Sequence, residues 1–249
     1  MDFVTFVKRI KEVNVTMFFI DVSYNEKRAL MALVEEFLAD DEISEMNKIL
    51  NKNDVVLLEE GKNSWLDKRM SCTTAVTWSN FNSRTWKLYK KTVRLSYARM
   101  MIAGSFFSGA LDYDSGSVQN ILMIGLGGGV INNYFSTMDE LKLNLTAVDN
   151  DPVMKIIAEK WYEFKSTSMQ RIIVDDGLRY IREANKRGER YDVLLIDVSY
   201  NEKRALMAPV EEFLADDEIS EMNKILNKNG AVIVNIVTRH EDLDQADRV

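Results

Sequence analysis

Short apolar runs alternate with amphipathic stretches through the second half of the chain. The runs are NILMIG, LNLTAVD, RIIVDD, YDVLLID and GAVIVNIV, and all of them lie beyond residue 119. Their length and their content of Val, Ile and Leu are typical of buried strands in a parallel sheet. Strands that alternate with helices favour an α/β fold. We expect a doubly wound, mostly parallel sheet of the Rossmann-like kind over residues 120–249.

Several helix boundaries can be predicted between these runs. Asp151 followed by Pro152 predicts a helix start, because an aspartate can cap the helix and a proline fits its first turn. The stretch GLRYIREANKR should end at Gly188, since glycine readily terminates a helix. The stretch DDEISEMNKIL is expected to stop at Asn229 and Gly230 for the same reason.

Residues 54–119 are less regular, and we treat them as a partly helical lead-in segment. The stretch SRTWKLYKKTVRLSYARMMIAG begins with basic residues and then becomes apolar, which favours a helix beside the sheet. We interpret its cations as a solvated helix face rather than as a patch that guides substrate.

An almost perfect repeat links the two ends of the chain. Residues 20–53 and 196–229 differ only at Leu33 and Pro209. Structural repeats let surface residues drift, so near identity indicates a recent duplication or an error in gene assembly. We therefore separate residues 1–53 as an N-terminal segment. Its stretches NVTMFFIDV and DVVLLEE are hypothesised to cover a sheet edge.

Composition narrows the classes of function. The 249 residues have a formal charge of -7 and a pI near 5.0, which disfavours nucleic acid and anionic membranes as partners. One cysteine and one histidine are too few for a disulfide or a zinc site. The N-terminus has no continuous apolar signal, and no apolar run approaches the ~20 residues that span a bilayer. We expect a soluble cytoplasmic protein without a metal.

The most informative segment is ILMIGLGGGVINNYF, in which a glycine-rich turn follows a strand and precedes a helix. Glycines at such a turn let the backbone approach a ligand closely. Asp149 ends the next strand, about 20 residues further on, where a carboxylate can bind the hydroxyl groups of a ribose. The spacing predicts a nucleoside ligand, although by itself it does not separate NAD from S-adenosylmethionine.

The next two strands favour S-adenosylmethionine. Asp176 follows the third run, where it can meet an adenine amino group, and Asp197 ends the fourth, beside the reactive end of the ligand. Because the carboxyl ends of parallel strands share one edge of the sheet, a single site accounts for all of these residues. A dehydrogenase would need a proton relay, for which His240 is too isolated. A nucleic-acid amino-methyltransferase should have a proline-rich turn where this chain has DVSY.

Four motifs together resemble the spermidine synthase-like branch of S-adenosylmethionine-dependent methyltransferases: IGLGGG, AVDNDPVMKIIAEKWYEF, VDDGLRYI and YDVLLIDVSYNEK. The resemblance covers roughly residues 95–240 and implies a class I methyltransferase fold. In that family the sheet continues with an antiparallel pair of strands. This chain ends at Val249, soon after its fifth run, so we expect a fold truncated after strand five.

The resemblance also implies a cofactor, S-adenosyl-L-methionine, and the residues that bind it. These are Gly125, Leu126, Gly127 and Gly129 at the turn, Asp149 and Asn150 at the ribose, Asp176 and Gly177 near the adenine, and Asp197 at the catalytic edge. The implied reaction is methylation of a protein amine, a lysine or an N-terminus, on a substrate such as a translation factor. We also consider that the chain forms a homodimer.

Two alternatives stay open. Aminopropyltransferases of the spermidine synthase type resemble GGGDGG at the turn and use a YHEM-like helix to hold a cationic amine. This chain has GLGGGV, and it has Arg99 where that helix carries its glutamate, with Arg94 close by. Like charges ~4 Å apart repel by about 1 kcal/mol in water, so a polyamine is disfavoured. The second alternative is an inactive, truncated binding module.

Overall fold

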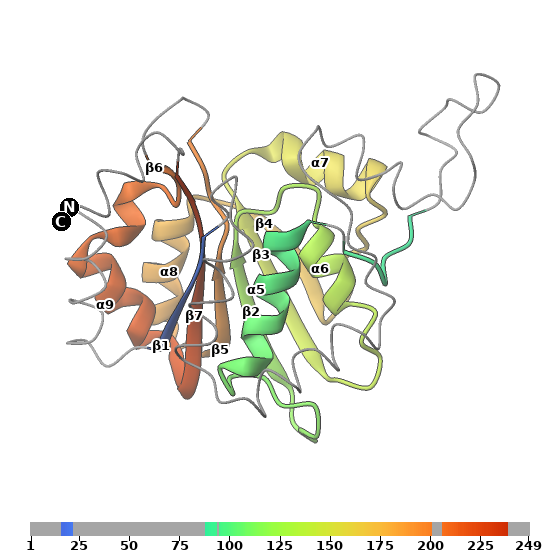
Figure 1. Ribbon diagram of the computed structural model, residues 1–249, viewed down its shortest axis with the longest axis horizontal. Helices are drawn as coiled ribbons and strands as arrows, with labels where there is room; N and C mark the ends of the chain where they lie inside the picture. The colour runs from blue at the N-terminus through green and yellow to red at the C-terminus, as the bar shows by residue number, and fades with distance from the viewer. Residues whose placement is uncertain (1–15, 22–87, 94, 201–205, 239–249) are drawn as a thin grey trace.

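The computed structural model describes residues 16–21, 88–93, 95–200 and 206–238 (Figure 1). Seven strands form its sheet in the order β1-β7-β5-β2-β3-β4, and β6 pairs with β7. Among these described strands, only β6 is antiparallel to its neighbour. The strands are β1 Thr16–Asp21, β2 Gln119–Ile124, β3 Leu143–Asp149, β4 Gln170–Val174, β5 Tyr191–Ile196, β6 Leu206–Ala208 and β7 Leu226–Thr238.

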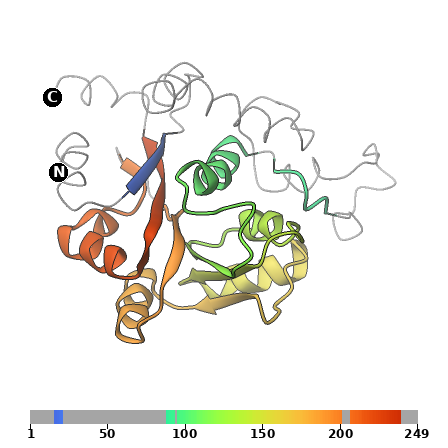
Figure 2. The same ribbon diagram turned by 90° about the horizontal axis from the view of Figure 1, so that it is seen from below.

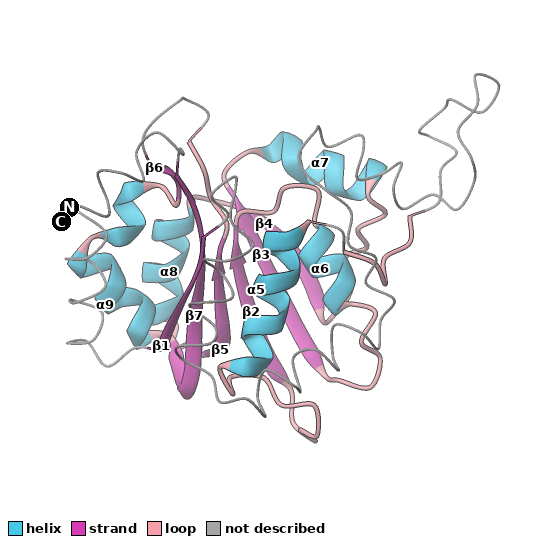
Figure 3. Cartoon of the chain, in the orientation of Figure 1, coloured by secondary structure: helices cyan, strands magenta, loops and turns pink. Residues whose placement is uncertain are grey.

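Helices cover both faces of the sheet, as Figures 2 and 3 show. One face carries α5 and α6, and the other carries α8 and α9. Neighbouring residues of β2 face opposite cores: Ile121 and Met123 pack with α5 and α6, whereas Leu122 and Ile124 pack with α8. The helices are α5 Ser96–Phe107, α6 Val130–Phe135, α7 Pro152–Trp161, α8 Gly177–Lys186, the 3-10 turn η1 Glu211–Leu214 and α9 Asp216–Lys224.

The predicted fold class is confirmed, and each of the five apolar runs forms a strand of the parallel sheet. The predicted caps of α7 and α8 are confirmed as well. The Asp151 carboxylate accepts a hydrogen bond from the Val153 N–H at 2.8 Å, and Gly188 follows α8 with a φ of 71°. The division into three segments stays a prediction, because residues 22–87 lie outside the described ranges.

Two predicted helix boundaries are wrong. The helix expected to run to Asn229 and Gly230 ends at Lys224, and β7 begins at Leu226. The pairing of β7 with β5 is interrupted after Leu226 and resumes at Ala231, so Gly230 belongs to a bulge in the strand and does not end the helix. The lead-in helix also starts late, at Ser96. Lys90 precedes it and donates to the Glu163 carbonyl, so it is not part of a solvated helix face.

The N-terminal segment covers a sheet edge through one of its two candidate stretches. β1 pairs in parallel with β7, from Thr16 opposite Ala231 to Asp21 opposite Ile236. The hypothesis for NVTMFFIDV is therefore confirmed, whereas DVVLLEE lies outside the described residues. Because β1 and β5 flank β7 on opposite sides, the two copies of the repeat start from different places in the sheet. None of the described helices is long and apolar enough to cross a bilayer.

Candidate functional site

The candidate site lies where the chain reverses its direction across the sheet. From β2 the chain adds β3 and β4 on one side, and it then returns to add β5 and β7 on the other. Such a switch point leaves a crevice at the carboxyl ends of the two central strands, which is where open α/β sheets bind ligands. The glycine turn follows β2, and Asp197 follows β5. The two strand ends are joined by a 2.9 Å hydrogen bond from the Asp197 N–H to the Ile124 carbonyl.

The glycine turn needs its glycines for two different reasons. Gly125, Gly127 and Gly129 have φ values of 91°, 50° and 71°, a region that other residues rarely adopt. A Cβ at Gly125 would also collide with the backbone carbonyl of Asp197. Gly127 is different, because it is exposed and no atom lies within 4 Å of the place of its Cβ. Gly127 is thus the point of the turn at which a ligand can reach the backbone.

Asp149 links the end of β3 to this turn by a hydrogen bond. One of its carboxylate oxygens accepts a hydrogen bond from the Leu126 N–H at 2.8 Å, and the other accepts from the Asp151 N–H at 2.9 Å. A carboxylate oxygen has more than one acceptor site, so both oxygens can still bind hydroxyl groups. Asp149 is partly buried beside the turn, and the adjacent Asn150 is exposed.

Asp176 and Gly177 lie at the start of α8. The exposed Asp176 carboxylate accepts from the Arg179 N–H at 2.8 Å and thereby caps the helix. A Cβ at Gly177 would collide with the Ile124 side chain, so this glycine lets α8 approach the end of β2. Asp176 therefore has a capping role that the sequence analysis did not assign to it, in addition to its place near the crevice.

Asp197 is the most perturbed acid of the site. The Asn235 side-chain amide donates to its carboxylate at 2.8 Å, and the Tyr97 side chain hydrogen-bonds to the same carboxylate. Burial raises the pKa of Asp197 above its usual range, and the two hydrogen bonds only partly oppose that rise. Perturbed acids of this kind occur often at functional sites.

Sequence reasoning missed Asn235 and Tyr97 as members of the site. Asn235 is a buried polar residue in the middle of the apolar strand β7, which was the available signal. Its amide oxygen is buried and has no hydrogen-bond partner among the residues that the structure describes. For Tyr97 the available signal was its position, because it aligns with the tyrosine of the YHEM-like helix to which the sequence around Arg99 was compared.

Two further features of the region concern charge. Arg99 lies on α5, two residues beyond Tyr97, and burial lowers the pKa of its guanidinium group. The side chain of Arg94 lies outside the described residues. Within the described part of the chain, no group of three or more His, Cys, Asp or Glu side chains could hold a metal ion.

Comparisons with known proteins place this site in context. No protein-family profile matches the chain. The chain is 29% identical over 126 residues to an eEF1A lysine and N-terminal methyltransferase homolog of Drosophila pseudoobscura pseudoobscura, which covers 50% of the chain and 19% of that protein. The human eEF1A lysine and N-terminal methyltransferase is 31% identical over 137 residues, again covering 19% of its length. The chain thus spans about a fifth of these relatives.

A third relative belongs to the polyamine enzymes. The polyamine aminopropyltransferase of Vibrio vulnificus is 30% identical over 145 residues, which cover 58% of this chain and 44% of that protein. Among solved structures, human methyltransferase-like protein 13 in complex with SAH matches 61% of this chain and 70% of its own, with a TM-score of 0.53 and 25% identity. The chain therefore has the Rossmann-like fold of class I S-adenosylmethionine-dependent methyltransferases and is similar to their spermidine synthase-like branch, the eEF1A lysine and N-terminal methyltransferases in particular.

Proposed function

We propose that this chain binds S-adenosyl-L-methionine and transfers its methyl group to an amine of a protein. The observation that carries the proposal is the pairing of two features at one switch point. The exposed glycine turn, which is hydrogen-bonded to Asp149, follows β2, and the partly buried Asp197 follows the neighbouring β5.

The residues present fit an adenosyl ligand. The exposed backbone of Gly127 would lie against the methionine moiety, and Asp149 would accept hydrogen bonds from the ribose hydroxyls. Asp176 would face the adenine amino group with the carboxylate oxygen that does not cap α8. When bound, the cofactor supplies a methyl group that its sulfonium has already activated.

The chain's own contribution would be alignment of the acceptor and exclusion of water. Methyl transfer requires a neutral amine held in line with the methyl group. Asp197 can accept a hydrogen bond from that amine, and its raised pKa suits it to hold the proton that the amine gives up. Asn235 and Tyr97 would keep the carboxylate oriented. Asp197 is therefore the residue that we assign to catalysis.

The acceptor is proposed from the relatives. Several relatives are named for the modification of eEF1A at a lysine and at the N-terminus. A protein amine, on a translation factor for instance, is thus the acceptor class that we propose for this chain. A cytoplasmic location and a homodimer stay predictions.

Aminopropyl transfer to a polyamine is the second candidate function, and the Vibrio relative favours it. Two features of this chain argue against it. The glycine turn lacks the aspartate of GGGDGG, and α5 carries the partly buried Arg99 in place of a glutamate. A partly buried guanidinium on this helix would repel a polycation that bound beside it.

Calorimetric titration of the purified chain tests both functions. We expect S-adenosylmethionine and S-adenosylhomocysteine to bind more tightly than decarboxylated S-adenosylmethionine. Asp149→Ala should weaken that binding by about 100-fold, because the ribose hydroxyls and the N–H group of the turn would both lose a charged hydrogen-bond acceptor. Glu189→Gln, which lies at the other end of β5, serves as the control and should bind normally. A preference for the decarboxylated ligand would instead support polyamine synthesis. If none of the three ligands binds, the result would favour the remaining alternative, an inactive binding module.

A further inference from the structure

The three residues that follow α7 pack directly against the glycine turn. We call Tyr162, Glu163 and Phe164 the exit segment. The helix ends at Trp161, Glu163 adopts a φ of 53°, and the chain then turns so that Phe164 is buried. A left-handed conformation at a glutamate is uncommon, so the packing around this segment must hold it in place.

Two aromatic rings of the exit segment lie under two consecutive glycines. A Cβ at Gly128 would be only 2.8 Å from two ring atoms of Tyr162, and a Cβ at Gly129 would be 3.3 Å from the Phe164 ring. Both rings are therefore in close contact with the backbone of the turn. Gly128 is not among the glycines with positive φ, so the Tyr162 ring is the obstacle to a larger residue at this position.

Hydrogen bonds fix the exit segment on both of its sides. On the inner side the buried Asn133 of α6 donates its side-chain amide to the Tyr162 carbonyl at 2.7 Å, and the Phe164 N–H donates to the Ala158 carbonyl of α7 at 3.0 Å. On the outer side the Lys90 ammonium donates to the Glu163 carbonyl at 2.5 Å. The segment thus connects α6, α7 and the residues before α5.

We propose that Tyr162 is a positioning residue that sets the shape of the glycine turn for the cofactor. Because the Tyr162 ring lies against Gly128, the turn cannot move toward α7, and the neighbouring Gly127 remains exposed to the crevice. The inference rests on the proposed function, because it assigns the turn to an adenosyl ligand. It adds a residue that does not itself contact that ligand and acts through the backbone of Gly128.

A double-mutant cycle between Tyr162 and Gly128 tests the proposal, with S-adenosylhomocysteine as the probe and calorimetry as the readout. We expect Gly128→Ala to weaken binding by about tenfold, because the new methyl group pushes the turn off the ring. Tyr162→Ala should weaken it by a similar factor, since the turn loses its support. In the double variant the methyl group has room, so its affinity should equal that of Tyr162→Ala alone and not fall a further tenfold.

Further variants separate positioning from general stability. Tyr162→Phe keeps the ring and should stay within about twofold of the wild-type affinity. Glu189→Gln, far from the turn, should lower the melting temperature without changing the affinity. The proposal is overturned if the two effects on affinity multiply, or if Tyr162→Ala lowers the melting temperature but binds normally. If the wild type itself binds no S-adenosylhomocysteine, the proposed function fails and this inference fails with it.

Discussion

Asp197, the residue that we propose for catalysis, is placed in the fold at the expense of stability. Its carboxylate is partly buried, and burial is the main reason why its pKa is raised. Above that raised pKa the folded state holds a poorly hydrated charge, whereas the unfolded state holds a hydrated one, so folding is disfavoured. Below about pH 4, the ordinary pKa of an aspartate, both states are protonated and the difference disappears.

We therefore expect Asp197→Asn to raise the melting temperature at pH 7, by ~2–4 °C for each kcal/mol of desolvation that it removes. The gain should shrink as the pH falls toward 4. Methyl transfer should drop by about 100-fold, since the amide cannot accept a proton. Thermal scans between pH 4 and 8 together with a turnover assay check both effects. Lower stability at pH 7 would show that the hydrogen bonds from Asn235 and Tyr97 outweigh the burial.

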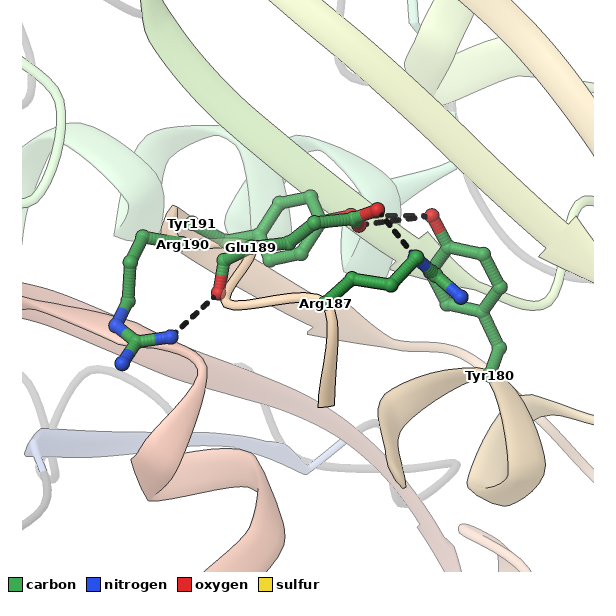
Figure 4. A network of polar contacts seen from close by, with 5 residues as sticks. All are labelled: Tyr180, Arg187, Glu189, Arg190 and Tyr191. Atoms are coloured by element: carbon green, nitrogen blue, oxygen red, sulfur yellow. Dashed lines mark hydrogen bonds and ion pairs between the residues drawn. The ribbon is translucent and has the colours of Figure 1, made fainter. Parts of the chain in front are cut away.

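At the scale of elements, a polar network joins the end of α8 to the start of β5, away from the candidate site (Figure 4). The Glu189 carboxylate accepts hydrogen bonds from the Tyr191 hydroxyl at 2.6 Å and from the Arg187 guanidinium at 2.6 Å. The hydroxyls of Tyr180 and Tyr191 lie 3.1 Å apart. Burial would by itself raise the pKa of Glu189, but the hydrogen bonds from Arg187 and from both tyrosines together lower it.

Glu189→Gln should accordingly cost about 1 kcal/mol of unfolding free energy at pH 7, a modest loss because the carboxylate is partly exposed. A lowered pKa gives stability that is present above the ordinary pKa of ~4.3 and is lost as the pH falls through the lower folded value. The difference from the wild type should thus disappear in acid. Urea unfolding at pH 7 and in acid measures it. An equal loss at both pH values would indicate that charge plays no part.

At the scale of the whole molecule, one edge of the sheet is formed by β1, which comes from the N-terminal part of the chain. β1 pairs along β7 from Thr16 to Asp21 and is the first strand in the order of the sheet. An uncovered strand exposes a row of unpaired N–H and C=O groups and invites association with other chains.

Removal of residues 1–21 should therefore lower the melting temperature and promote concentration-dependent association. Removal of residues 1–15, which leaves β1 in place, is the matched control and should do so less. Light scattering over a range of concentrations and a thermal scan compare the two. Identical behaviour of both truncated chains would mean that the pairing of β1 with β7 contributes no stability.

The parallel sheet and the turn were predictable because their signals are local. Five apolar runs of strand length became strands, and the glycines before α6 adopt the positive φ values that only glycine tolerates easily. The boundary near Gly230 failed because the same glycine can end a helix or allow a bulge. The choice was made by the pairing of β7 with β5, which lies far away in the sequence.

The hydrogen-bond partners of Asp197 could not be predicted from the sequence for a related reason. Its place at the end of a strand could be inferred from the pattern, but Tyr97 and Asn235 come from elements 100 and 38 residues away, and only packing brings their side chains to one carboxylate. The contact of Tyr162 with Gly128 is of the same kind.

The sequence by itself thus determined the order of the elements, the glycine turn and the acids at the strand ends, since each depends on residues close together in the chain. Only the tertiary structure decided where the first copy of the repeat begins in the sheet. Both copies carry the same IDV residues, yet Ile196 pairs with Val234 beside β2, whereas Ile20 pairs with Asn235 on the outer side of β7. The two identical Ile-Asp pairs have different neighbours here because strand pairing, a long-range interaction, sets what surrounds each of them.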